Sequence, residues 1–398
     1  MKITFKKTLH KLHLWLGLAS GLVVFIIAIT GCIYAFEAEI QNLTQPYKFV
    51  QAQDKAFLPP SILRNIADKS LPDKHAHAVM YKSNKDAAQV IYFSLEEDYY
   101  YTVYLNPYTG QLQQVRDMNT GFFHWILEGH FYLWLPHEIG QPVVATATLI
   151  FTFMVLSGLY LWWKRKKGSS GQKFKIKWDA KWRRVNYDMH NVLGFYVMII
   201  ALIFALTGLV WGFEWFAKSY YKVASGGEDL VEYYEPVSDT TKIIQHAIPV
   251  EDQIWQKMVK DYPTAEAIEV HVAESKASSI GANANPDAST YWKADYKYFD
   301  QYTLKEIPVK HIYNNFQQAN TADKLLRMNY DIHTGAVWGF AGKLLAFFAS
   351  LVVASLPVTG AFIWWGRKKK ERKPKSSKKE KSACCSGINN NRQIVQAL

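Results

Sequence analysis

The chain has 398 residues, of which 49% are hydrophobic and 20% are charged, and its formal net charge is +12. A soluble protein of this length would form two or three domains. Four uncharged spans of 21 to 23 residues exclude that class, because about 20 apolar residues cross the core of a bilayer. The four spans lie at residues 14–36, 143–163, 191–213 and 344–365.

The first span resembles a signal peptide in following a short basic start, but it is long for one. No small-x-small cleavage site closes it, and Glu37 and Glu39 follow instead. We therefore expect an uncleaved membrane helix, with residues 1–36 forming a cytoplasmic foot and the first spanning helix.

The basic residues are concentrated in three stretches. Residues 1–13, 164–184 and 366–398 hold 25 of the 46 Lys and Arg residues but only three of the 34 acids. These stretches carry +22, and the rest of the chain, whose charges lie almost entirely in the two long loops, carries −10. The positive-inside rule then predicts a multi-pass protein with both termini in the cytoplasm. We interpret the Lys-rich tail as a topology signal that contacts anionic lipid, and we expect no nucleic-acid partner.

The first outer segment, 37–142, contains a predicted α+β domain at about 56–116. A short helix is expected from Pro60 to about Lys69, followed by strands at 78–81, 89–95, 99–105 and 112–116. Residues 119–142 are amphipathic and aromatic, and Pro136 and Pro142 should break them. The second spanning helix, 143–163, leads into a basic cytoplasmic loop, 164–186, and the third helix occupies 187–213.

The second outer segment, 214–330, repeats this plan. It has a predicted helix at 251–261, a strand at 267–272, a mobile polar loop at 275–289 and a late strand pair at 291–300 and 303–308. The fourth helix falls within 331–366. The basic tail, 367–398, is expected to be disordered, and the role of Cys384 and Cys385 in it is open.

Two similar halves emerge, each with an outward helix, an outer domain and a returning helix. A Ser/Thr-Gly step recurs late in every span. Small residues pack membrane helices in general, so one such step is a weak signal, but four in register indicate duplication. The steps are Thr30-Gly31, Ser157-Gly158, Thr207-Gly208 and Thr359-Gly360.

Histidines mark the ends of these helices, and ionisable residues at such positions call for a functional explanation. His13 and His190 begin the first and third helices at the same predicted depth, near the cytoplasmic face. Gly17 and Gly194 follow one turn later and would clear space beside each imidazole. We interpret this pair as axial ligands of one haem, with His10 as the alternate to His13. Close helix packing is the competing interpretation.

A second site is expected at the outer face. His333 precedes the fourth helix and repeats the Asn-Tyr-Asp-x-His pattern that contains His190. Three histidines precede the second helix. His124 lies among apolar residues and is the preferred partner, His130 is the alternate, and His137 lies in an expected turn. His75, His77, His246, His271 and His311 are interpreted as surface residues of the outer domains.

The pattern resembles the PepSY-associated transmembrane family, also called iron-regulated membrane proteins. The resemblance rests on Leu12-His13-Leu14-Trp15-Leu16-Gly17, Ser157-Gly158-Leu159-Tyr160-Leu161-Trp162-Trp163, both Asn-Tyr-Asp-x-His stretches and the hairpin Asn106-Pro107-Tyr108-Thr109-Gly110. It implies a polytopic α-helical protein with four spanning helices in two duplicated halves and two small PepSY-like α+β domains, the second one degenerate. Relatives studied as ferric-siderophore reductases imply two b-type haems held here by His13, His190, His124 and His333.

The leading hypothesis is a transmembrane electron conduit of the bacterial inner membrane. It would take electrons from a quinol or a separate flavoprotein and would reduce ferric iron or a ferric siderophore outside, as a haem-dependent reductase. No Gly-x-Gly-x-x-Gly and no P-loop is present, so nicotinamide, flavin and ATP are not expected to bind this chain. The absence of Cys-x-x-Cys-His excludes covalent c-type haem. The alternative is a membrane-anchored PepSY module that binds or inhibits other proteins without redox activity.

Overall fold

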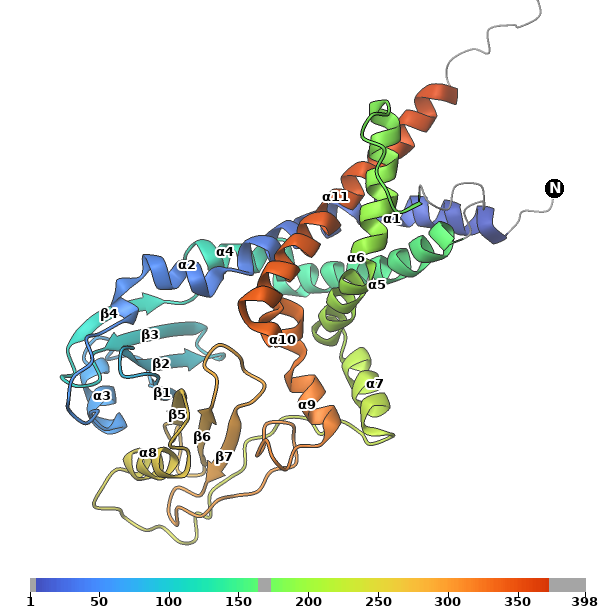
Figure 1. Cartoon of the computed structure of the whole chain (residues 1–398). Helices are drawn as coiled ribbons and strands as arrows, with labels where there is room; N and C mark the ends of the chain where they lie inside the picture. The colour runs from blue at the N-terminus through green and yellow to red at the C-terminus, as the bar shows by residue number, and fades with distance from the viewer. Residues whose placement is uncertain (1–4, 164–172, 372–398) are drawn as a thin grey trace, which may run out of the picture.

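The computed structural model describes residues 5–163 and 173–371. Four long helices form a bundle, and a β-sheet domain lies at one end of it (Figure 1). All four helices are long and apolar enough to cross a membrane, which confirms the four predicted spans. They are α1 (Phe5–Tyr34), α5 (His137–Trp163), α6 (Trp182–Gly212) and α11 (Gly339–Glu371).

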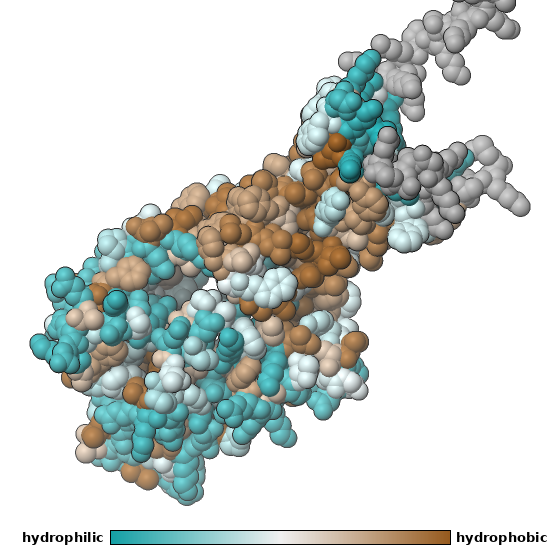
Figure 2. Space-filling model, viewed as in Figure 1, coloured by the Kyte–Doolittle hydropathy of each residue, from teal (hydrophilic) through white to brown (hydrophobic). Residues whose placement is uncertain are grey.

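The hydrophobic surface of the molecule coincides with this bundle. Figure 2 shows a brown band over the long helices, with hydrophilic residues on the sheet domain and at the opposite end. The long helices expose large apolar side chains such as Leu22, Ile199 and Phe348. A soluble monomer rarely exposes so large an apolar surface, whereas a bilayer covers it.

The helices pack in a ring in which α1 and α6 each contact both α5 and α11. Figure 1 shows the α1–α5 pair and the α6–α11 pair diverging away from the sheet. At mid-height the helices meet through small residues, including Ala28, Ala201 and Ala354, which are buried in one apolar cluster. A Cβ atom at Gly21 would lie 3.3 Å from the Cβ of Pro357, so α1 approaches α11 too closely there for a larger residue.

One antiparallel sheet of seven strands contains the strands of both outer segments, in the order β4-β3-β2-β1-β5-β6-β7. The two segments join where β1 pairs with β5, with Val79 opposite Val270. The strands are β1 (Ala78–Tyr81), β2 (Ala88–Ser94), β3 (Tyr99–Leu105), β4 (Leu112–Asp117), β5 (Ala267–His271), β6 (Ile280–Asn285) and β7 (Asp295–Phe299).

Two helices, α3 (Pro60–Ala67) and α8 (Val250–Asp261), pack on the apolar face of this sheet. They are joined to each other through buried polar contacts. The Ser61 hydroxyl donates to Asp252 Oδ2 at 2.6 Å, and the Ser61 amide donates to Asp252 Oδ1 at 2.8 Å. The two segments therefore form one continuous body, whereas the sequence predicted two separate domains.

Two expectations for the second segment are wrong. Residues 280–285, expected to lie in a mobile loop, form β6 inside the sheet. The inward side chains there are Ile280, Ala282 and Ala284, and alanine is a weak strand signal because it buries little apolar area. Residues 303–308 were expected to form a strand, but they make only an isolated bridge between Phe299 and Glu306.

Short helices connect the sheet to the bundle. They are α2 (Glu37–Thr44), the 3-10 helix η1 (Pro46–Lys48), α4 (Phe122–Tyr132), α7 (Glu214–Ser225), α9 (Thr321–Arg327), α10 (Asn329–Thr334) and the 3-10 helix η3 (Ala336–Trp338). Helix α4 packs against α1, and α10 packs against α6. Pro136 ends the turn after α4 as predicted, but Pro142 lies inside α5, which already begins at His137. These contacts place the histidines of α4 and α10 at the sheet end of the bundle.

Candidate cofactor site at four histidines

Four histidines contact the Ser/Thr-Gly steps of neighbouring helices. In each case the imidazole Nδ1 lies within hydrogen-bond distance of the hydroxyl oxygen. The four contacts are His13 to Ser157 at 2.8 Å, His130 to Thr30 at 3.1 Å, His190 to Thr359 at 2.9 Å and His333 to Thr207 at 2.7 Å. In the sequence, the Ser/Thr-Gly steps indicated duplication of the two halves. In the structure, their hydroxyl groups are also the contact partners of the four histidines.

The direction of these hydrogen bonds follows from the hydroxyl groups. Thr207 donates its single proton to the Ile203 carbonyl of its own helix at 2.7 Å, and Thr359 donates to the Ser355 carbonyl at 2.9 Å. The Thr30 and Ser157 hydroxyls donate in the same way, to the Ile26 and Met154 carbonyls. A hydroxyl that gives its single proton to the helix carbonyl accepts from its other neighbour, and in that arrangement each imidazole donates through Nδ1. The Nε2 lone pair is then free to bind a metal.

The glycine of each step faces the same imidazole ring. A Cβ atom at Gly31 would lie 3.2 Å from His130 Cε1, and one at Gly360 would lie 3.4 Å from His190 Cε1. The corresponding distances are 3.3 Å from Gly158 to His13 and 3.7 Å from Gly208 to His333. The hydroxyl residue thus orients each ring, and the following glycine makes room for its edge.

At the sheet end, His130 and His333 lie opposite one another. Their ring centroids are 6.1 Å apart at an interplanar angle of 71°. Trp211 and Phe204 of α6 lie beside His333, at ring distances of 5.3 and 5.8 Å. Phe131 adjoins His130 at 5.8 Å. Aromatic side chains therefore surround this pair and limit access of water to it.

His13 and His190 form the corresponding pair at the far end of the bundle. They lie on α1 and α6, which are diagonal in the helix ring, and each contacts the Ser/Thr-Gly step of a neighbouring helix. The expectation that these two residues hold one haem stays a prediction. The apolar cluster around Ala28 and Ala201 separates this pair from the sheet-end pair.

An asparagine supports the hydroxyl residue in two of the four contacts. Asn186 Nδ2 donates to the Thr359 carbonyl at 3.0 Å, and Asn329 Nδ2 donates to the Thr207 carbonyl at 3.1 Å. Both asparagines precede the contacting histidine by four residues, so they lie on the same helical face. In each Asn-Tyr-Asp-x-His stretch, the asparagine therefore contacts the carbonyl of one threonine and the histidine contacts the hydroxyl of the same threonine.

The structure differs from the sequence interpretation over which histidine of α4 faces His333. His130, the alternate, occupies that place. The preferred residue, His124, lies 4.0 Å from Glu128 of its own helix. His137 is exposed and lies against Tyr132 at a ring distance of 5.0 Å. Residues 124 and 130 are six apart and so lie on different faces of α4, and only the face with His130 packs on α1.

Three other candidates lie apart from these contacts. His10 accepts a hydrogen bond from Arg367 at 3.0 Å near the far end of the bundle. Gly17 faces Met154 of α5, whose Cε atom would lie 2.7 Å from an added Cβ, and Gly194 faces Leu356 of α11 at 3.5 Å. These two glycines therefore let helices approach each other, which is the packing role that the sequence left as the competing interpretation.

Among the histidines of the sheet domain, His311 is not a surface residue as expected. It is 1% exposed, and the rings of Tyr233, Tyr234 and Tyr298 surround it. His77 and His271 meet at the β1–β5 junction with ring centroids 4.7 Å apart. A cavity of about 130 Å³ opens beside them.

The sheet-end pair fits a metal held by two axial imidazoles. A bond from metal to imidazole nitrogen is about 2 Å long, so two rings that bind one metal from opposite sides have centres roughly 6 Å apart. The 6.1 Å separation of His130 and His333 matches that requirement, and the Nδ1 contacts leave the correct nitrogen free. These residues therefore fit a haem with two histidine ligands.

Comparison with known proteins supports the membrane assignment. The family model of the PepSY-associated TM region matches residues 10–367, which include all four long helices and the sheet domain. None of the curated proteins compared with the chain matches it. Since the match covers most of the chain and the four helices are long enough to span a bilayer, this multi-pass membrane protein belongs to the PepSY-associated transmembrane family.

Proposed function

We propose that the protein transfers electrons across the bacterial inner membrane with two b-type haems, one at each end of the bundle. It would reduce ferric iron or a ferric siderophore on the side of the sheet domain. The observation that carries this proposal is the opposed pair of His130 and His333, whose Nδ1 atoms are both held by threonine hydroxyls.

In this proposal the protein chain positions the haems and shields them from water. Haem bound at the two histidine pairs would provide one-electron redox centres near the two membrane faces. Thr30 and Thr207 keep the sheet-end imidazoles in one tautomer, and Trp211 limits contact with water. The small residues at mid-height keep the helices close, so each pair has its own space.

Orientation and partners form part of the proposal. The basic loop 164–186 and both termini would lie in the cytoplasm, which places the sheet domain in the periplasm. A quinol or a separate flavoprotein would donate electrons near His13 and His190. The acceptor would approach His130 and His333 from the sheet side, where the two outer segments carry a net −9 that favours cationic complexes.

Haem content tests this function directly. The purified protein should bind two haems, with an absorption spectrum that changes on reduction by dithionite. His13→Ala and His190→Ala should each remove one haem, and the double variant should remove no more than one. His130→Ala should remove the other haem, whereas His124→Ala, a change in the same helix, should keep both. A purified protein without haem, or loss of two haems in the first double variant, would contradict the proposal.

The cavity beside His77 and His271 supports a second candidate function, a module that binds a peptide or protein through the sheet domain. That function requires no haem. A protein that takes up no haem on reconstitution, and whose His130 and His333 variants behave as the unmodified chain does, would favour it.

A further inference from the structure

The two Asn-Tyr-Asp-x-His stretches differ in what their aspartate contacts. At the far end, Asp188 binds Arg184 of its own helix, with 2.8 Å between the carboxylate and Nε. At the sheet end, Asp331 accepts hydrogen bonds from the backbone amides of Tyr291 at 3.1 Å and Trp292 at 3.2 Å. Asp331 therefore ties α10 to the loop between β6 and β7, some 40 residues earlier in the chain.

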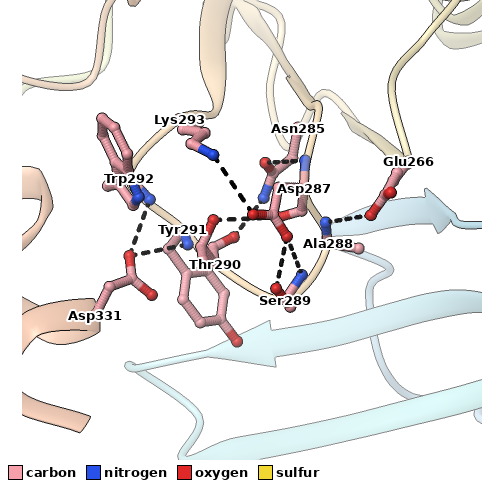
Figure 3. Close-up of polar contacts among 10 residues, drawn as sticks. All are labelled: Glu266, Asn285, Asp287, Ala288, Ser289, Thr290, Tyr291, Trp292, Lys293 and Asp331. Carbon is pink, nitrogen blue, oxygen red and sulfur yellow. Dashed lines mark hydrogen bonds and ion pairs between the residues drawn. The ribbon is translucent and has the colours of Figure 1, made fainter. Parts of the chain in front are cut away.

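That loop is held firmly against the sheet. Asp287 accepts from the Ser289 amide and hydroxyl at 3.1 and 2.6 Å, and it lies 3.6 Å from Lys293. The Ala288 amide donates to Glu266, which immediately precedes β5, at 3.0 Å. Figure 3 shows these contacts forming a compact turn from which the Tyr291 and Trp292 amides point to Asp331.

The Asp331 carboxylate is 0% exposed, and it makes both hydrogen bonds through Oδ2. Its other oxygen, Oδ1, is buried without a hydrogen-bond partner in the described part of the chain. Burial of a carboxylate is unfavourable unless strong hydrogen bonds offset it, so the two amides are important to the conformation of this segment.

The position of Asp331 links this contact to the sheet-end histidine pair. It lies two residues before His333 in the short helix α10. The adjacent Tyr330 contacts Tyr291 of the loop at a ring distance of 5.4 Å and Trp211 at 6.3 Å, and Trp211 contacts His333 at 5.3 Å. A movement of the loop relative to α10 would therefore shift the His333 imidazole. It would act through the backbone of α10 and through the ring contacts of Tyr330 and Trp211.

We infer that Asp331 is a positioning residue through which the β6–β7 loop of the sheet domain fixes the orientation of His333. The inference rests on the proposed function, since it concerns the same histidine as a haem ligand. It goes beyond that function because it makes the sheet domain a structural support of the outer site. The far end differs, because within the described residues the Asp188 carboxylate pairs with Arg184 of its own helix.

Four substitutions in the full-length protein test this role. Asp331→Ala removes both acceptor contacts. Asp331→Asn keeps an oxygen that can occupy the place of Oδ2, so it should preserve both contacts and rescue the effect of the alanine. Asp188→Ala removes the matched residue at the other end. Asp287→Ala loosens the loop without changing α10, and it should resemble Asp331→Ala in a weaker form.

Two measurements distinguish positioning from general stability. Amide hydrogen exchange at residues 291 and 292 should become about tenfold faster in Asp331→Ala prepared without haem, and should stay unchanged in Asp188→Ala. In the haem-loaded protein, Asp331→Ala should alter the low-spin electron paramagnetic resonance signal of the outer haem alone. Asp331→Asn should retain the original signal.

The outcomes separate this inference from the proposed function. If the protein binds no haem at all, the proposed function fails, and the exchange measurement still reports on the contact. If two haems bind and Asp331→Ala leaves the outer signal and the exchange rates unchanged, the positioning role is wrong. A signal that changes equally in Asp331→Ala and Asp331→Asn would also overturn it, because the hydrogen bonds would then not be the cause.

Discussion

Substitution of Thr207 with valine removes one hydroxyl group and changes little else. Valine is β-branched like threonine and of similar volume, so the steric packing of α6 should persist and the lost hydroxyl is the main change. In the native chain this hydroxyl lies 2.7 Å from His333 Nδ1 and donates to the Ile203 carbonyl. In the variant the His333 N–H loses its acceptor in a largely apolar setting, and the ring is free to turn.

The size of the effect follows from the contact that is lost. A buried donor left without its partner costs about 1–3 kcal/mol, and outer-shell partners of metal-binding histidines typically contribute about 10–100-fold in affinity. We therefore expect the outer haem of Thr207→Val to bind about 10–100-fold more weakly. The haem at His13 and His190 should keep its affinity, because Thr207 lies at the other end of the bundle.

Competition for haem by a soluble haem-binding protein measures this affinity. Thr207→Ser, which retains the hydroxyl, should bind nearly as the unmodified protein does. Thr152→Val is the matched control, since the Thr152 hydroxyl donates to the Thr148 carbonyl of its own helix at 3.0 Å. If the outer haem of Thr207→Val binds as tightly as that of Thr152→Val, the hydroxyl does not orient His333, and the interpretation of all four contacts would be wrong.

Three further changes test other parts of the structure. Gly31→Ala should lower the affinity for the outer haem more than Gly208→Ala does. The added Cβ would lie 3.2 Å from the facing imidazole at residue 31 but 3.7 Å at residue 208, so equal haem affinities would argue against this crowding. Burial alone would lower the pKa of His271, but its hydrogen bond with Glu269 raises that pKa overall above 6.5. The protonated His271 therefore stabilises the folded protein fully below pH 6.5, and this stabilisation is lost as the pH rises through the raised pKa. The melting temperature of the full-length protein should fall over that pH range, and Glu269→Gln should make the melting temperature depend less on pH. The same pH dependence in Glu269→Gln would contradict this role of the pair. Reporter fusions in the loop 164–186 should score as cytoplasmic and fusions in the sheet domain as periplasmic, and the reverse result would overturn the proposed orientation.

The spanning helices and most strands could be predicted because local patterns determine them. Residues 99–105 are mostly aromatic and β-branched and lie between clear turns, and the structure has β3 at the same residues. The union of both segments in one sheet could not be predicted. It depends on the pairing of Val79 with Val270, a contact across almost 200 residues that neither strand signals alone.

The inner histidine pair was proposed from the sequence for a simple geometric reason. His13 and His190 both lie in the first third of long helices that run in the same direction, which places them at similar depth along the bundle. The outer pair required knowledge of a turn. Leu133 and Trp134 both adopt positive φ angles of 55° and 57°, and this pair of left-handed residues lies between the end of α4 and the start of α5.

The choice between His124 and His130 therefore depended on tertiary contact rather than on local composition. The apolar neighbours of His124 suggested a haem edge, but exposed apolar residues such as Phe122 and Trp125 belong equally to a helix near a membrane surface. The more useful signal in the sequence was the repetition of four Ser/Thr-Gly steps beside four terminal histidines. A hydroxyl that already donates to its own helix can serve a neighbour only as an acceptor. His130 is the side chain that meets the Thr30 hydroxyl, while His124 lies on another face of α4.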